Sequence, residues 1–150
     1  MTHNLLHQYE ILFNKASSDL KLAKLAASAK DAGIDDATII FHLQQSSEKL
    51  LKSILAVHDI HFEKIHDLTQ LIELCRNSGI ELPQYTKDFA ALNPFAVIGR
   101  YDLISSDEFD MSAWINKIEN FKEYTAQAIK SYIEKQHKEN ETGHNQSENG

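Results

Sequence analysis

The chain has 150 residues, 42% of them apolar and 25% charged, with a formal net charge of −7 and a single cysteine. A chain of this length can bury the core of one domain without disulfides, and its composition excludes the disordered and membrane-spanning classes. The negative charge disfavours non-specific attraction to nucleic-acid phosphates, so any RNA contact requires a local basic surface.

The first predicted helix covers residues 5–30, and Gly33 ends it. Its apolar residues recur at three- and four-residue spacing, which is the pattern of one buried helical stripe. Asp35 or Asp36 can cap the next helix by accepting a hydrogen bond from a free backbone N–H of its first turn. That second helix extends to about His58 and shows the same apolar spacing.

A third helix is predicted after a linker at residues 61–66. Asp67 is placed to cap this helix, and Gly79 to end it. The helix carries Cys75 in an apolar stretch, so we expect that thiol to be a buried core side chain.

The fourth helical region covers residues 84–100, and we expect a kink or a restart at Asn93-Pro94. Proline lacks a backbone N–H and disfavours helical geometry in the residue before it. A polar stretch at residues 102–110 separates this region from a long final helix at residues 111–132.

The fold predicted from these segments is an all-α antiparallel bundle, because the chain has no long period-two alternation that would indicate strands. We expect one helical domain at residues 1–136. Residues 137–150 lack apolar side chains and cannot repay their ordering entropy, so a disordered polar tail is expected there. The chain has neither a secretory signal nor a second cysteine, which together indicate a cytoplasmic protein.

The second helix carries an unusual number of polar residues between Phe41 and Lys52. Gln44 and Glu48 are four residues apart, and so are Glu48 and Lys52, which is the spacing of neighbours on a helix surface. Gln45 and Lys49 share the same relationship. Two interpretations fit this pattern: a solvated face held by ordinary pairs, or the wall of a ligand site.

Three separated motifs resemble the HEPN domain family: HLQQSSEKLLK at residues 42–52, HDL at residues 66–68, and Arg100-Tyr101. The resemblance covers roughly residues 16–133. It implies an up-and-down bundle of four to five helices and a homodimer. It also implies a minimal nucleotidyltransferase as partner, in two-component modules that include toxin–antitoxin systems.

Many catalytic members of that family are metal-independent ribonucleases, marked by an arginine followed after four to six residues by a histidine. The two arginines here, Arg76 and Arg100, have no histidine at those distances. At those distances Arg100 is followed by Ser105 and Ser106. General acid–base cleavage of RNA needs a group that titrates near neutral pH, and serine cannot supply it. The ribonuclease activity therefore requires a histidine from elsewhere in the chain or from a dimer partner.

Arg100 and Tyr101 are the strongest candidates for ligand binding, because arginine suits phosphate and a tyrosine ring can stack on a base. The alternative is that Arg100 pairs with an acidic residue and Tyr101 packs beneath the loop. We expect the other donors to come from the second helix and to face an anion without an excess of carboxylate nearby. The predicted ligand residues are His42, Gln45, Lys49, Lys52, Arg100 and Tyr101, and the predicted supporting residues are Gln44, Glu48, His66 and Asp67.

No metal site or cofactor is predicted. His58, His61 and His66 are close in sequence, but their spacing matches no zinc pattern, and we expect His66 to bond backbone at the start of the third helix. Three functions follow as hypotheses. The first is a module that binds a nucleotide or RNA and partners a nucleotidyltransferase, the second a ribonuclease with a degenerate motif, and the third a structural dimerisation domain.

Overall fold

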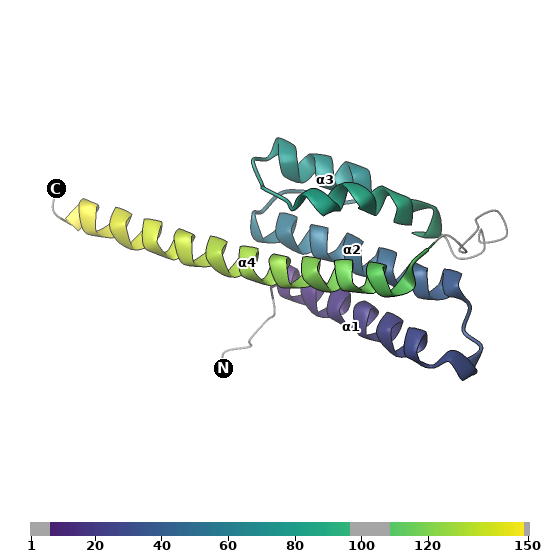
Figure 1. Cartoon of the computed structure of the whole chain (residues 1–150). Helices are drawn as coiled ribbons and strands as arrows, with labels where there is room; N and C mark the ends of the chain where they lie inside the picture. The colour runs from purple at the N-terminus through teal and green to yellow at the C-terminus, as the bar shows by residue number, and fades with distance from the viewer. Residues whose placement is uncertain (1–6, 97–108, 149–150) are drawn as a thin grey trace.

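The structure is a computed structural model that describes residues 7–96 and 109–148. The helices pack as an up-and-down bundle (Figure 1), and no strand occurs in those two ranges. The all-α prediction is thus confirmed. In chain order, with η for a 3-10 helix, the elements are α1 (Gln8–Ser28), η1 (Lys30–Ala32), α2 (Asp36–Val57), α3 (Leu68–Asn77), η2 (Gln84–Ala96) and α4 (Met111–Glu148).

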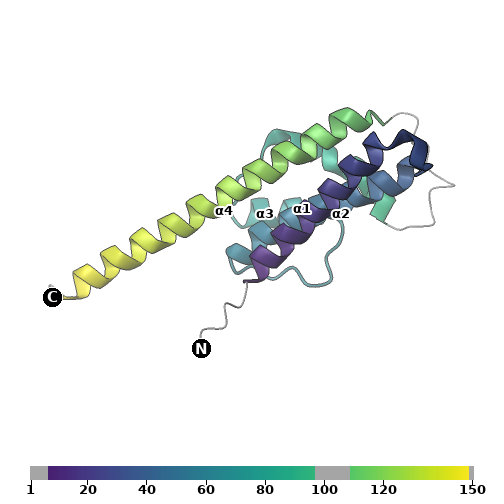
Figure 2. The ribbon, with the colours of Figure 1, turned by 90° about the horizontal axis from the view of Figure 1, so that it is seen from below.

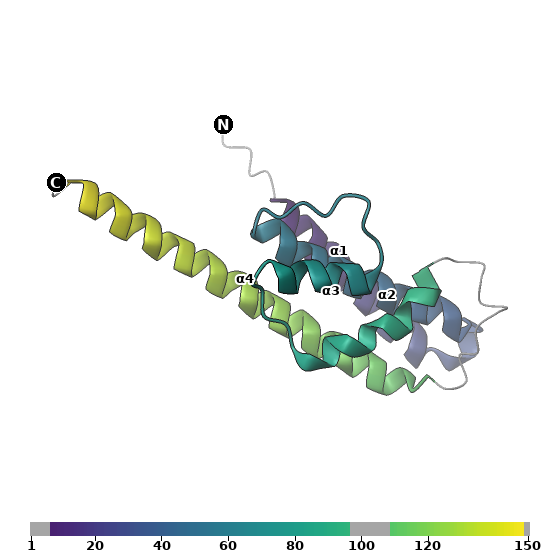
Figure 3. The same cartoon turned by 90° about the horizontal axis from the view of Figure 1, so that it is seen from above.

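α2 is the central helix, since it contacts α1, α3, η2 and α4. Figure 1 shows α2 between α1 and the pair formed by α3 and η2, and Figure 3 shows that pair in front of α2. α2 is therefore buried around most of its circumference, and its small polar residues must find partners inside the bundle. Ser46 Oγ donates to the carbonyl of Ala16 at 2.8 Å, which joins α1 to α2 where both side chains are small.

The caps lie where the sequence predicts them. Asp35 accepts a hydrogen bond from the Thr38 backbone N–H at 2.7 Å, which decides between Asp35 and its neighbour Asp36. Asp67 accepts from the Gln70 N–H at 3.1 Å and begins α3 in the same way. Gly79 follows α3 with a φ of 79°, in the left-handed region that favours glycine.

η2 differs from the expected kinked α-helix. Residues 84–96 wind as a 3-10 helix with Pro94 inside it, so the expected interruption at Asn93-Pro94 does not occur in this range. Pro94 lacks the backbone N–H that an α-helix and a 3-10 helix both use, so its missing bond does not select between the two windings. The Asn93 side chain is also engaged, because its Oδ1 accepts from the Leu68 backbone N–H at 2.9 Å and ties η2 to the start of α3.

An aromatic cluster fastens η2 to α4. Phe89 and Phe121 are both fully buried and meet edge to face, with ring centroids 5.2 Å apart. Burial of two such rings stabilises the bundle strongly, because each aromatic side chain removes a large apolar area from water. This contact holds the first half of α4 against the core.

α4 continues as a helix to Glu148, past residue 136, where the sequence predicts the folded domain to end. Residues 134–142 are exposed, and all three ribbon views show this half of α4 projecting beyond the bundle. The helical backbone differs from the disordered chain that the composition predicts. Its many Glu, Lys and Gln residues are good helix formers, and the packed first half supplies the nucleus. The domain boundary at residue 136 stays a prediction.

Among the described residues, no helix combines the length and the apolar character needed to cross a bilayer.

Candidate functional site

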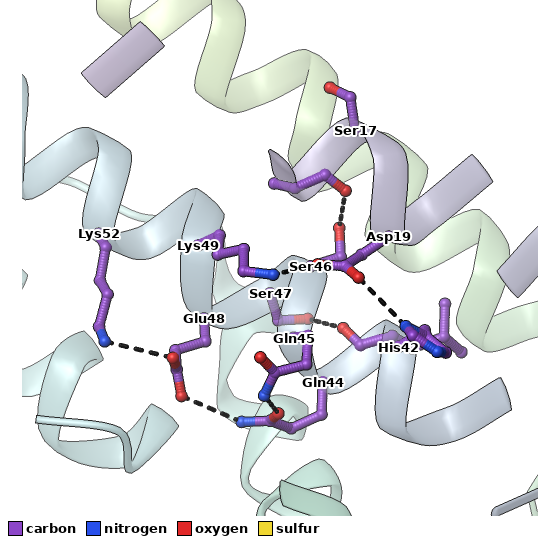
Figure 4. A network of polar contacts seen from close by, with 12 residues as sticks. Ser17, Asp19, His42, Gln44, Gln45, Ser46, Ser47, Glu48, Lys49 and Lys52 are labelled. Atoms are coloured by element: carbon purple, nitrogen blue, oxygen red, sulfur yellow. Dashed lines mark hydrogen bonds and ion pairs between the residues drawn. The ribbon is translucent and has the colours of Figure 1, made fainter. Parts of the chain in front are cut away.

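Four predicted ligand residues form one stripe along α2. Gln45, Lys49 and Lys52 follow His42 by three, seven and ten residues, the spacing of side chains on one helix face. His42, Gln45 and Lys49 are partly exposed, whereas Lys52 is buried. Figure 4 shows these side chains in a polar network of two groups, one around Asp19 and one around Glu48.

Asp19 of α1 holds one end of the network. Its carboxylate contacts His42 Nδ1 at 3.1 Å through one oxygen and the Lys49 ammonium through the other. A single acidic side chain thereby fixes two of the predicted donors and ties α1 to α2. Asp19 is not among the residues predicted from the sequence. The available signal was a charged residue beside the buried stripe, since Asp19 precedes the buried Leu20.

Glu48 organises the other end, inside the bundle. Its carboxylate accepts from Lys52 Nζ at 3.2 Å and from Gln44 Nε2 at 3.4 Å, and Gln45 Nε2 in turn donates to Gln44 Oε1 at 2.6 Å. Gln44, Glu48 and Lys52 are at most 8% exposed. The interpretation of this helix face as solvated is therefore wrong for these three residues, because the elements packed around α2 cover them.

His66 extends this end of the network to the surface. Its Nδ1 lies 3.3 Å from Lys52 Nζ and 3.5 Å from a Glu48 carboxylate oxygen, and its side chain is 70% exposed. These side-chain contacts replace the predicted bond to backbone, since His66 precedes α3 closely enough for its ring to reach α2. Lys52 also lies 5.8 Å from the centre of the Phe62 ring, a cation–π distance.

Two carboxylates among these donors change the expected electrostatics. Lys49 pairs with Asp19 and Lys52 with Glu48, so each lysine of the stripe has its own acidic partner. One carboxylate for each lysine is no excess of carboxylate, and the assignment of a ligand site to this stripe stays a prediction. An anion reaching it must compete with a carboxylate for each ammonium, which lowers the gain from binding there.

Comparison with protein families decides the identity of the bundle. The model of the HEPN domain matches residues 9–129, which is most of the chain. The chain belongs to the HEPN domain family. Searches of curated proteins and of solved structures give no match. Within this HEPN domain the match covers α1, α2, α3 and η2 and the packed part of α4, so the network described above lies wholly inside the family region.

The remaining predicted residues divide into two groups. Asp67 has the structural role of a helix cap, as described above. Arg100 and Tyr101 lie outside the residues that the structure describes, so their part in ligand binding stays a prediction.

The structure gives no support for metal ligation by the described residues of the HEPN domain, where no group of three His, Cys, Asp or Glu side chains is arranged to hold an ion. His58 already has two contacts. Its Nδ1 donates to the Ile54 carbonyl at 2.9 Å, and the centroid of its ring lies 3.9 Å from that of the Tyr132 ring. Cys75 is fully buried, and burial raises the pKa of its thiol to about 12.

Proposed function

We propose that this HEPN domain binds a nucleotide or RNA and acts beside a minimal nucleotidyltransferase, as the two parts of a cytoplasmic toxin–antitoxin-type module. The observation that carries the proposal is the network along α2. Gln44, Glu48 and Lys52 of α2 lie in the interior of the bundle. Apolar side chains of similar volume stabilise a fold equally well or better at such positions. Such a network is costly for stability alone, and its hydrogen bonds lead outward to His66 at the surface.

Arg100 and Tyr101 complete the proposed site. An arginine fork provides two parallel donors for a phosphate, and an adjacent tyrosine ring provides a stacking surface for a base. The stripe on α2 then orients the ligand rather than supplying the main positive charge, because its lysines already have acidic partners.

Calorimetry with ATP and with single-stranded RNA tests the binding. Arg100→Ala should weaken binding by about 1.5–3 kcal/mol, the scale of a hydrogen bond to a charged group. Arg100→Lys should restore only part of the loss, because a point charge does not reproduce the fork. Arg76→Ala is the matched control, since Arg76 is the other arginine of the chain and is exposed at the end of α3. Absence of wild-type binding to either ligand contradicts the proposal.

The partner is tested by purification of the tagged protein from its native cells, followed by mass spectrometry of the proteins bound to it. Recovery of a nucleotidyltransferase in a fixed ratio supports the two-component module. We propose in addition that the domain is a homodimer, as the family resemblance implies. Light scattering should then give twice the 17.1 kDa mass of one chain, and a mass of one chain across micromolar concentrations contradicts the dimer.

A ribonuclease is the second candidate function, and His66 favours it. This imidazole is largely exposed beside an ammonium and a carboxylate, and histidine is the side chain that titrates near neutral pH. RNA decay that disappears in both His66→Ala and Arg100→Ala variants supports the enzyme. Decay that persists in both variants points to a contaminating nuclease.

A further inference from the structure

A groove between α1 and the first half of α4 gathers positive charge in a chain whose net charge is −7. Its volume is about 650 Å³, within the size range of ligand sites. Figure 2 shows α1 and this part of α4 on the same side of the bundle. Three lysines line the groove, Lys21 and Lys24 from α1 and Lys122 from α4, and the only carboxylate in its lining is Glu119.

The balance of charge distinguishes this groove from the network on α2. Glu119 forms an ion pair with Lys24 across the groove, and Lys21 and Lys122 have no acidic partner among the described residues. In the α2 network, by contrast, every lysine is paired. Lys21 and Lys122 can therefore contact an anion without first breaking an ion pair, whereas Lys24 must exchange Glu119 for the anion.

The two places are separate surfaces. At about 100° per residue, Lys21 lies roughly 200° around α1 from Asp19, and Lys24 roughly 140°. In Figure 4 the side chain of Ser17, which lines the groove, points away from Asp19. Substitutions in the groove can thus be made without touching the network.

We infer that the phosphate backbone of single-stranded RNA binds in this groove, at Lys21, Lys24 and Lys122. The inference rests on the proposed function and assigns its RNA a surface. The lining contains lysines, serines and leucines but no aromatic side chain, so it offers donors for phosphate and no ring on which a base could stack. That set favours a backbone over a mononucleotide, whose base needs recognition of its own.

A membrane surface is the competing polyanion, because Leu22 and Leu25 are 48% and 59% exposed beside these lysines. Of these two exposed leucines, only Leu25 lines the groove. A hollow between two helices fits a strand of nucleic acid, whereas a helix that lies on lipid presents a protruding apolar face. The concave shape therefore favours RNA.

Fluorescence anisotropy with a labelled single-stranded RNA of about a dozen nucleotides tests the inference. Three lysine contacts predict a slope of log affinity against log salt near −2, which is roughly a twentyfold loss between about 50 and 200 mM salt. Lys21→Gln/Lys122→Gln should weaken binding about tenfold at low salt. It should also reduce the loss of affinity between about 50 and 200 mM salt to about threefold. Lys130→Gln/Lys135→Gln is the matched control, because it makes the same charge change on exposed residues of α4 outside the groove.

A second variant tests the same groove by gain of affinity. Glu119→Gln removes the partner of Lys24 and should strengthen RNA binding several-fold, whereas Glu123→Gln, an exposed neighbour outside the groove lining, should not. Circular dichroism of each variant verifies that the helices are intact.

The possible outcomes distinguish a failure of the groove assignment from a failure of the proposed function. RNA binding by the wild type that neither groove variant alters overturns the groove and leaves the proposed function standing, with Arg100 as its remaining site. No RNA binding by the wild type removes both the groove and the RNA arm of the proposed function. Sedimentation with phosphatidylserine vesicles, lost in Lys21→Gln/Lys122→Gln while RNA does not bind, assigns the groove to lipid. Displacement of RNA by an equimolar mononucleotide overturns the assignment of the groove to the RNA backbone.

Discussion

Lys52 Nζ lies 3.2 Å from a carboxylate oxygen of Glu48, one helical turn away on α2, with only 10% and 8% of the two side chains exposed. Two opposite charges in the interior have given up most of their hydration, and their mutual attraction repays that cost only while both are present. The pair therefore contributes little as a unit, yet each member depends strongly on the other.

Removal of one partner should be far more costly than removal of both. Lys52→Met leaves the buried Glu48 carboxylate without its ammonium partner, and should lower the free energy of unfolding by about 3–5 kcal/mol. Glu48→Gln/Lys52→Met should recover most of that loss, because no buried charge remains. Urea unfolding measures both, with Lys87→Met as a control at an exposed lysine of η2. A double variant as unstable as the sum of its two single variants contradicts this account.

The two neighbouring aspartates before α2 should differ in their effect on stability. Asp35→Ala removes the acceptor for the Thr38 N–H, and should cost about 0.5–2 kcal/mol. Asp36→Ala removes only a negative charge in the first turn, which is worth a few tenths to about 1 kcal/mol. Thermal unfolding of the two variants gives the comparison, and a larger loss for Asp36→Ala would reverse the assignment of the cap.

The sequence predicts features that depend on near neighbours in the chain. Helical period and capping are of this kind, so α1, α2, α3 and the caps at Asp35 and Asp67 agree with prediction. The role of Asp19 is different, because its partners His42 and Lys49 are 23 and 30 residues away. Their meeting depends on how α1 and α2 align, which no local pattern determines.

The burial of the polar face of α2 could not be predicted from the sequence either. The spacing of Gln44, Glu48 and Lys52 identifies neighbours on a helix but not what covers them. A stripe of paired polar residues reads as solvated because most such stripes are exposed. Only the packing of α1, α3, η2 and α4 around α2 places these side chains inside the bundle.

Cys75 should make stability depend on alkaline pH. Burial raises the pKa of the folded thiol to about 12, whereas an unfolded thiol titrates near 8.5. The folded state holds this proton more tightly, so the stabilisation is complete below about pH 8.5 and is lost as the pH rises toward 12. Wild type should lose about 2 kcal/mol more than Cys75→Ala between pH 7 and pH 10, as measured by urea unfolding. Titration of the lysines affects both proteins alike and cancels in this comparison. An equal loss of stability in wild type and Cys75→Ala would mean that the thiol is in contact with water.

Removal of residues 137–150 should leave the melting temperature unchanged. The side chains of residues 134–142 are exposed, so their removal takes no apolar area out of the core, and a helix without packing is only marginally stable in water. Trypsin should cut first after Lys135 or Lys138, and the truncated protein should lose little of the total helical signal in circular dichroism. Truncation after Tyr124 is the contrasting control, because it also removes Thr125 and Ile129, which are buried against the bundle. A fall of several degrees on removing residues 137–150 alone would mean that this end of α4 docks on the domain or on a second copy of it, and the boundary at residue 136 would then be wrong.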